Sequence, residues 1–256
     1  MSAQHKHYHD GDMNAKDLVE THFSHGQVDI VEESTGFPMM VMHKRVSKGL
    51  LKGSKLLDFS LGSSVYQLFP LCNIYKEMYV LELTDSHIDH MKLWLDKDEK
   101  ATDWSFAAKR VCQLDGNRKD WRELEDQARQ AVKSVLKWEN HETNPIDPKL
   151  VPEVDCVISM YILSVCKTKE ELQNTLKNLV SPLKIGGHLI WFLPLNMSYY
   201  MVGQHRFFVQ PINEKTFQEF VINAGFVIEE SGLMKNAEKS DLRDYSHVGY
   251  VVARKV

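Results

Sequence analysis

Two carboxylates that lie 24 residues apart, Asp58 and Glu82, are the first candidates for chemistry. Asp58 ends the apolar run "KLLDF" just before a small-residue turn, "SLGSS", and Glu82 lies near the end of the next apolar run, "EMYVLEL". In a doubly wound sheet, the turn after the first strand and an acid at the end of the second hold a nucleoside-containing ligand. The spacing therefore predicts a cofactor site. The same spacing is explained equally well if Asp58 only caps the turn and Glu82 is a surface acid.

The turn after Asp58 carries a single glycine, Gly62. A pyrophosphate needs a close approach to the backbone, which side chains obstruct, so a nicotinamide dehydrogenase is disfavoured. A cofactor without phosphate, such as S-adenosylmethionine, demands less of this turn.

Short apolar runs alternate with amphipathic stretches of helical length from residue 55 onward. Strands are expected at 55–59, 77–83, 154–160, 188–193, 226–234 and 247–255. Helices are expected at 37–48, 86–99, 122–138, 169–183 and 213–225. This order predicts an α/β fold: a mostly parallel sheet with helices on both faces and an antiparallel hairpin of the last two strands at one edge.

No linker or repeat divides the chain, so we expect residues 36–256 to form one domain and residues 1–35 to form an N-terminal extension. The extension mixes charge with scattered apolar residues between 13 and 35, which indicates one or two short helices outside the main core.

Composition excludes several classes of function. A net charge of −4 in 256 residues gives no basic footprint for nucleic acid, and the longest apolar stretch, "GGHLIWFLPL", is too short to span a membrane. The polar N-terminus predicts a cytoplasmic protein. The four cysteines form no CxxC pair, and the histidine cluster at 5, 7 and 9 lies in a polar terminus, so we expect buried thiols, solvated histidines and no metal site.

Five segments together resemble one enzyme family: "LLDFSLGSSVYQL", "CQLDGNRKDW", "LKIGGHL", "NMSYYMVGQHRF" and the closing "VARK". They are similar to the nicotinamide, phenylethanolamine and indolethylamine N-methyltransferases, from about Phe23 onward. The resemblance implies a Rossmann-like class I methyltransferase fold and S-adenosyl-L-methionine as cofactor.

The resemblance also implies the residues of the cofactor pocket, several of them altered. Ser60, Leu61 and Gly62 stand where the family has Gly-Ser-Gly, and Glu82 stands for its ribose aspartate. His87 replaces an asparagine, and Glu139 corresponds to the aspartate that holds the adenine. The implied cofactor-binding set is Asp58, Ser60, Gly62, Ser63, Tyr66, Gln67, Glu82, Leu83, His87, Glu139, Asn140 and Met160.

The acceptor side departs further from the family. Val28 and Glu33 stand where the family has lid tyrosines, so the extension is expected to be a degenerate lid. Ser164 and Leu193 stand where two carboxylates hold the acceptor in relatives. Trp191, Tyr199 and Tyr200 are further candidates for the acceptor pocket, although packing of the strand and the following turn explains such aromatics as well.

Methyl transfer from a sulfonium requires mainly that a nucleophile be held in line and that water be excluded. The resemblance therefore predicts a monomeric methyltransferase that acts on a nitrogen or sulfur atom of a small molecule lacking a cationic amine. Because the loop, the lid and the acceptor positions all differ together, a catalytically impaired binding or structural protein is the alternative.

Overall fold

The computed structural model describes residues 14–23, 32–116, 120–138, 143–236 and 240–256. The helical elements are α1 (Ala15–His22), η1 (Glu32–Gly36), α3 (Phe37–Ser47), α4 (Leu68–Leu71), α5 (Asp85–Leu95), α6 (Ser105–Leu114), α7 (Trp121–Ala131), η2 (Ile162–Val165), α8 (Lys169–Leu179) and α9 (Glu214–Asn223). The strands are β1 (Lys55–Phe59), β2 (Glu77–Glu82), β3 (Val132–Lys137), β4 (Val154–Met160), β5 (Leu183–Leu195), β6 (Tyr199–Val202), β7 (His205–Phe208), β8 (Phe226–Lys235) and β9 (His247–Lys255).

Seven strands form one sheet in the order β3-β2-β1-β4-β5-β9-β8. β3, β2, β1, β4 and β5 are parallel, whereas β9 is antiparallel to both β5 and β8. This is the predicted α/β fold, with the antiparallel pair at one edge. The strand order reverses between β1 and β4, so a ligand is expected beyond the carboxyl ends of these two strands.

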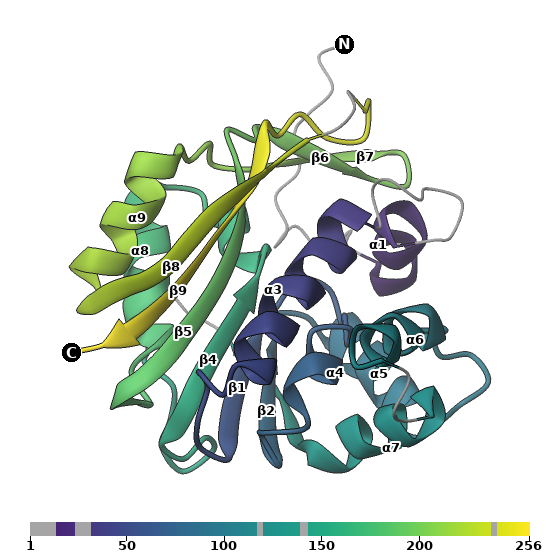
Figure 1. Ribbon diagram of the computed structural model, residues 1–256. Coiled ribbons are helices and arrows are strands. Elements are labelled where there is room, and N and C mark those ends of the chain that lie inside the picture. The colour runs from purple at the N-terminus through teal and green to yellow at the C-terminus, as the bar shows by residue number, and fades with distance from the viewer. Residues whose placement is uncertain (1–13, 24–31, 117–119, 139–142, 237–239) are drawn as a thin grey trace.

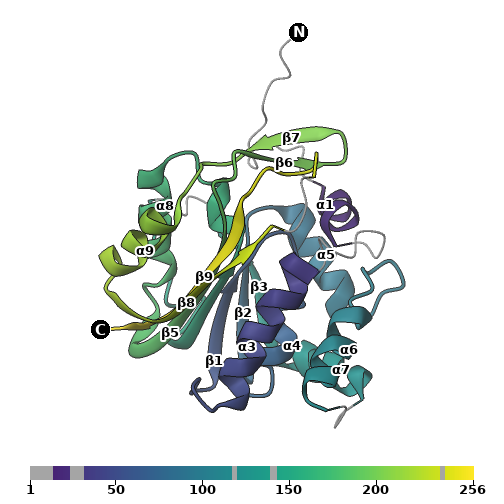
Figure 2. The same ribbon diagram turned by 45° about the horizontal axis from the view of Figure 1, so that its top comes forward.

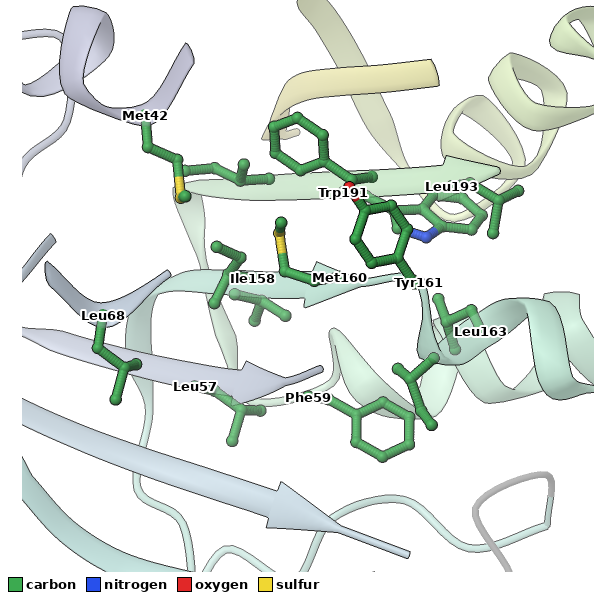
Figure 3. Packing of buried hydrophobic residues seen from close by; sticks show 14 of the residues in the cluster. Met42, Leu57, Phe59, Leu68, Ile158, Met160, Tyr161, Leu163, Trp191 and Leu193 are labelled. Atoms are coloured by element: carbon green, nitrogen blue, oxygen red, sulfur yellow. The ribbon is translucent and has the colours of Figure 1, made fainter. Parts of the chain in front are cut away.

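Helices cover both faces of the sheet, α8 and α9 on one side and α3 to α7 on the other (Figures 1 and 2). The inner strands β1, β4 and the second half of β5 are buried on both faces, so their sequences read as continuous apolar runs. Figure 3 shows this core, in which Leu57 on β1, Ile158 on β4 and Met42 on α3 are all fully buried.

The short helix α1 and the hairpin of β6 and β7 lie together at the carboxyl end of the parallel strands (Figure 1). The Nε2 atom of His22 lies 2.7 Å from the carbonyl oxygen of Met201, and the amide of Gly203 donates to Thr21 Oγ1 at 3.2 Å. The domain boundary expected at residue 35 falls within η1, which runs directly into α3.

One expected element is wrong. Residues 122–138 were expected to form a single helix, but the helix ends at Ala131 and Val132–Lys137 form strand β3. The apolar residues of this segment have helical spacing, but β3 gains a ladder of backbone hydrogen bonds with β2, which outweighs local propensity. The hairpin of β6 and β7 was not expected.

All four cysteines, Cys72, Cys112, Cys156 and Cys166, are buried free thiols. Within the described ranges, every helix is too short or too polar to cross a membrane.

Candidate functional site

The turn after β1 is bound to the end of β2 through Glu82. The amide of Ser63 donates a hydrogen bond of 2.9 Å to Glu82 Oε1. Ser63 has a φ of 55°, in the left-handed region, so the turn is wound tightly enough to present this amide. Glu82 is only 2% exposed, and burial, followed by the nearby Asp58 carboxylate, raises its pKa well above the usual range.

Asp58 lies at the centre of a second network. Its carboxylate accepts hydrogen bonds from the Ser60 hydroxyl and, at 2.8 Å, from Gln67 Nε2. Ser60 Oγ also accepts from the amide of Met160 at 3.2 Å, which joins the turn to the end of β4. Burial raises the pKa of Asp58 to about 6, even though both hydrogen bonds oppose that rise.

The helix α1 covers the turn. Gly62 has a φ of 72°, and a β-carbon placed on it would lie 2.0 Å from Leu18 Cδ2. Leu18 is fully buried, and Phe23 after α1 packs against Tyr66 and Trp104 with ring centroids 5.9 and 5.5 Å apart. The amino end of α1 is held by a hydrogen bond of 3.4 Å from the Ala15 amide to Ser86 Oγ.

Other residues of the expected cofactor set lie around this turn. His87 is buried, and its Nδ1 lies 3.7 Å from Glu82 Oε2. Burial lowers the pKa of His87 to about 3, so this side chain is neutral near pH 7. Leu83 is buried beside Glu82, and Tyr66 donates to the carbonyl oxygen of Ser34 at 2.9 Å.

These residues suit the polar end of a nucleoside ligand. Gln67 Oε1 is buried and has no hydrogen-bond partner, which leaves an acceptor for a ligand donor. Glu82 and Asp58 are buried carboxylates with raised pKa values, and such groups gain from donors such as ribose hydroxyls or an ammonium group. The hydrogen-bond donors and acceptors at the turn therefore fit S-adenosylmethionine. The Leu18 side chain, which lies against Gly62, blocks the approach to this turn.

A cavity of about 50 Å³ lies beside the turn. Its lining includes Leu61 from the turn, His22 and Phe23 from the end of α1, and Ser164, Tyr200 and Arg243. Tyr200 is buried, stacks on Phe207 with ring centroids 5.4 Å apart, and has a hydroxyl group without a hydrogen-bond partner. Ser164 donates to the carbonyl oxygen of Tyr161 at 2.6 Å.

Three other expected acceptor residues are placed outside the lining of this cavity. Trp191 and Leu193 are fully buried on β5 (Figure 3). The Trp191 ring packs edge-on against Phe217 of α9, with ring centroids 4.5 Å apart. Tyr199 is half-buried, with the Arg206 guanidinium 4.1 Å from its ring centroid. The structure therefore brings Ser164 and Tyr200 together at the cavity and places these three in packing contacts.

Sequence reasoning missed two residues at this cavity, Arg243 and Tyr245. Glu33, expected at a lid position, is buried and accepts a hydrogen bond from the Tyr245 hydroxyl. An Arg243 nitrogen lies 3.7 Å from Glu33 Oε2. Both residues belong to the loop before β9, which carries no motif that would have indicated them; only the packing of the loop against β6 reveals them.

Some expected residues lie outside the described ranges: Val28, Glu139, Asn140 and the histidines at 5, 7 and 9. In the described part of the chain, no group of three His, Cys, Asp or Glu side chains is arranged to hold a metal ion.

Comparison with known proteins gives a family. Residues 2–256 match the model of the NNMT/PNMT/TEMT family. The chain is 31% identical to indolethylamine N-methyltransferase of Oryctolagus cuniculus, over 94% of this chain and 92% of that protein. It is 34% identical to nicotinamide N-methyltransferase of Homo sapiens, over 80% of this chain and 78% of that protein.

Solved structures support the fold. An S-adenosylmethionine-dependent methyltransferase from Clostridium acetobutylicum superposes with a TM-score of 0.59 at 10% identity, covering 94% of this chain and 99% of that one. Magnesium protoporphyrin IX methyltransferase from Synechocystis, with S-adenosylmethionine bound, gives a TM-score of 0.55 at 13% identity, over 96% of this chain and 100% of that one. The sheet and its helices are thus those of class I methyltransferases.

Proposed function

The chain belongs to the NNMT/PNMT/TEMT family, and we propose on this premise that it is an S-adenosylmethionine-dependent methyltransferase with a small-molecule acceptor. The observation that carries the proposal is the hydrogen bond of 2.9 Å from the Ser63 amide to Glu82. It places the turn after β1 beside the acid at the end of β2, and these are the two parts of a doubly wound sheet that contact a nucleoside ligand.

Three polar residues at the turn have a role in this proposal. Glu82 accepts hydrogen bonds from the ribose hydroxyls of the cofactor. The unpaired Gln67 Oε1 and the Asp58 carboxylate accept hydrogen bonds from the amino group of its methionine part. Bound S-adenosylmethionine supplies a methyl group on a sulfonium. The protein then has to orient the acceptor and exclude water, and an acceptor atom with a free lone pair needs no general base.

The acceptor pocket is proposed to be the cavity beside Leu61, at the edge of the cofactor turn. Ser164 supplies a hydroxyl group where relatives have a carboxylate, and Leu193 is buried in packing. A cationic amine would therefore find no carboxylate to pair with in this cavity. We propose an acceptor that is methylated on nitrogen or sulfur and that carries no cationic amine.

The covering helix α1 favours a second candidate function. In the described arrangement Leu18 fills the space over Gly62, and the cavity of about 50 Å³ is far below the roughly 300 Å³ or more of typical ligand pockets. A family member that retains the fold for binding or structure, without methyl transfer, would have such a closed site. An active enzyme would have to displace α1 to admit its cofactor.

One experiment separates the two. The purified full chain is titrated calorimetrically with S-adenosylmethionine and, separately, with S-adenosylhomocysteine, and is then assayed with a panel of pyridines, thioethers and amines. Micromolar binding with formation of S-adenosylhomocysteine supports the methyltransferase. Absence of binding to either compound would refute it and favour the structural alternative.

We also propose that the protein is a cytoplasmic monomer without a nucleic-acid partner. Its four free thiols suit a reducing compartment, and its net charge of −4 provides no attraction for a polyanion.

A further inference from the structure

Arg243 places a permanent positive charge at the wall of the acceptor cavity. Its side chain is nine-tenths buried and lines the cavity together with Tyr200 and Leu61. The loop that carries it is fixed from two sides. The backbone of Arg243 forms a bridge with Tyr200 of β6, and the neighbouring Asp244 accepts hydrogen bonds from the amides of Ser198 and Tyr199 at 2.7 and 3.2 Å.

The guanidinium of Arg243 is only partly engaged by protein groups. Its one ion pair within the described residues is with Glu33 at 3.7 Å, and its carbon lies 4.8 Å from the centre of the Tyr245 ring. Glu33 also accepts a hydrogen bond from the Tyr245 hydroxyl group. A guanidinium has five N–H donors in a planar fork, so Arg243 retains donors for a ligand while it keeps its contact with Glu33.

The remainder of the cavity wall carries no opposing charge. Among its described lining residues, Arg243 is the only permanently charged side chain, and its ion-pair partner Glu33 is not one of them. His22 is neutral near pH 7, since burial and then the charge of Arg243 lower its pKa to about 4. Ser164 and the buried Leu193 stand at the two positions where the family resemblance places carboxylates in relatives.

We propose that the methyl acceptor of this protein is an anionic heteroaromatic, whose carboxylate pairs with Arg243 and whose ring nitrogen faces the cofactor turn. This inference rests on the proposed function and names its substrate class. Tyr161 and Tyr245 supply aromatic walls for a flat ring, and the unpaired hydroxyl group of Tyr200 donates a second hydrogen bond to the carboxylate.

The reaction balances without a base or an oxidant. The lone pair of the ring nitrogen forms the new N–C bond while the S–C bond of the sulfonium breaks, which leaves a neutral thioether and a cationic ring. No proton is released. The product is a zwitterion, and its carboxylate is still paired with Arg243.

The cavity must enlarge for this acceptor, because about 50 Å³ is too small for a pyridine ring. His22 and Phe23 form the wall on the side of α1, and α1 also covers Gly62. The displacement of α1 that admits the cofactor therefore also opens the acceptor cavity.

The test compares two acceptors of the same shape, pyridine-3-carboxylate and pyridine-3-carboxamide. With the full chain and S-adenosylmethionine, kcat/KM is expected to favour the carboxylate by about ten- to a hundredfold, the range of hydrogen bonds to a charged group. Arg243→Gln is expected to abolish this preference while the Kd of S-adenosylhomocysteine stays within about twofold. Arg206→Gln, which removes an exposed guanidinium on β7, serves as the matched control and should retain the preference.

Removal of Arg243 alone leaves Glu33 buried without its cation, so Glu33→Gln/Arg243→Gln provides a second, charge-balanced variant. If the wild-type protein methylates the carboxamide better than the carboxylate, the inference is wrong and the proposed function stands. The inference is also wrong if the preference survives in the charge-balanced variant. Failure to bind any cofactor would overturn the proposed function and this inference with it.

Discussion

Leu18 lies directly over Gly62, so closely that a β-carbon on the glycine would meet the leucine side chain at 2.0 Å. The contact joins a helix at the start of the chain to the turn that is proposed to hold the cofactor. The turn and its cover are thus one packed unit, and binding at the turn is coupled to the position of α1.

The first prediction concerns this cover. Leu18→Ala should tighten the binding of S-adenosylhomocysteine, because truncation of a buried leucine weakens the closed state by about 2–5 kcal/mol. Titration calorimetry measures the affinity, and hydrogen exchange of residues 15–22 measures the docking of α1. Lys16→Ala, at an exposed position of the same helix, is the control. Weaker binding by Leu18→Ala would show instead that α1 closes over the bound cofactor.

The second prediction concerns the acid at the end of β2. Glu82→Ala should weaken cofactor binding by about 1–3 kcal/mol, since the hydrogen bonds between its carboxyl group and the ribose hydroxyls are lost. Glu77→Ala, at the other end of the same strand, should leave the affinity unchanged. Equal cofactor affinities of the two variants would mean that Glu82 stabilises the turn but does not bind the cofactor.

A third prediction rebuilds the turn. Ser60→Gly with Leu61→Ser restores the residue types that the family has at these positions. Because this change removes the Leu61 side chain from the cavity wall and frees Asp58 from the Ser60 hydroxyl, cofactor affinity should rise. Each single variant is titrated beside the double variant. If none of them gains affinity, the turn does not limit binding.

The fourth prediction follows from the raised pKa of Asp58. Folding favours the protonated acid, so its contribution to stability is fully present below pH 3.8 and is lost as pH rises through about 6. Asp58→Asn keeps the neutral form, and Gln67 can turn its unpaired oxygen toward the new amide. Without cofactor, the variant should exceed the wild type by up to about 3 kcal/mol in free energy of unfolding at pH 7, and by little near pH 4.

Urea denaturation at a series of pH values measures this difference. Asp89→Asn removes an exposed carboxylate on α5. Its difference from the wild type in free energy of unfolding should not increase with pH. A constant difference between Asp58→Asn and the wild type across the series would contradict the raised pKa.

The sheet was predictable because its inner strands, such as β1 and β4, are buried apolar runs of characteristic length, and the family motifs identified Asp58, Gly62 and Glu82. Strand β3 escaped prediction because Val132 and Leu136 satisfy a helical period as well as a strand, and only pairing with β2 decides between them. Arg243 and Tyr245 escaped because their role depends on contacts with Glu33, more than 200 positions earlier in the chain. The cover by Leu18 is likewise a product of packing, which has no local signature.

Strand β9 lies between β5 and β8, although it follows both in the sequence. During synthesis, β5 and β8 therefore have no hydrogen-bonding partner at their facing edges until His247–Lys255 has left the ribosome. Unpaired strand edges invite pairing with other chains, so the nascent protein is most exposed to aggregation in this interval. The dependence of this protein on chaperones during synthesis should thus be set by how quickly the β9 segment leaves the ribosome and inserts between β5 and β8.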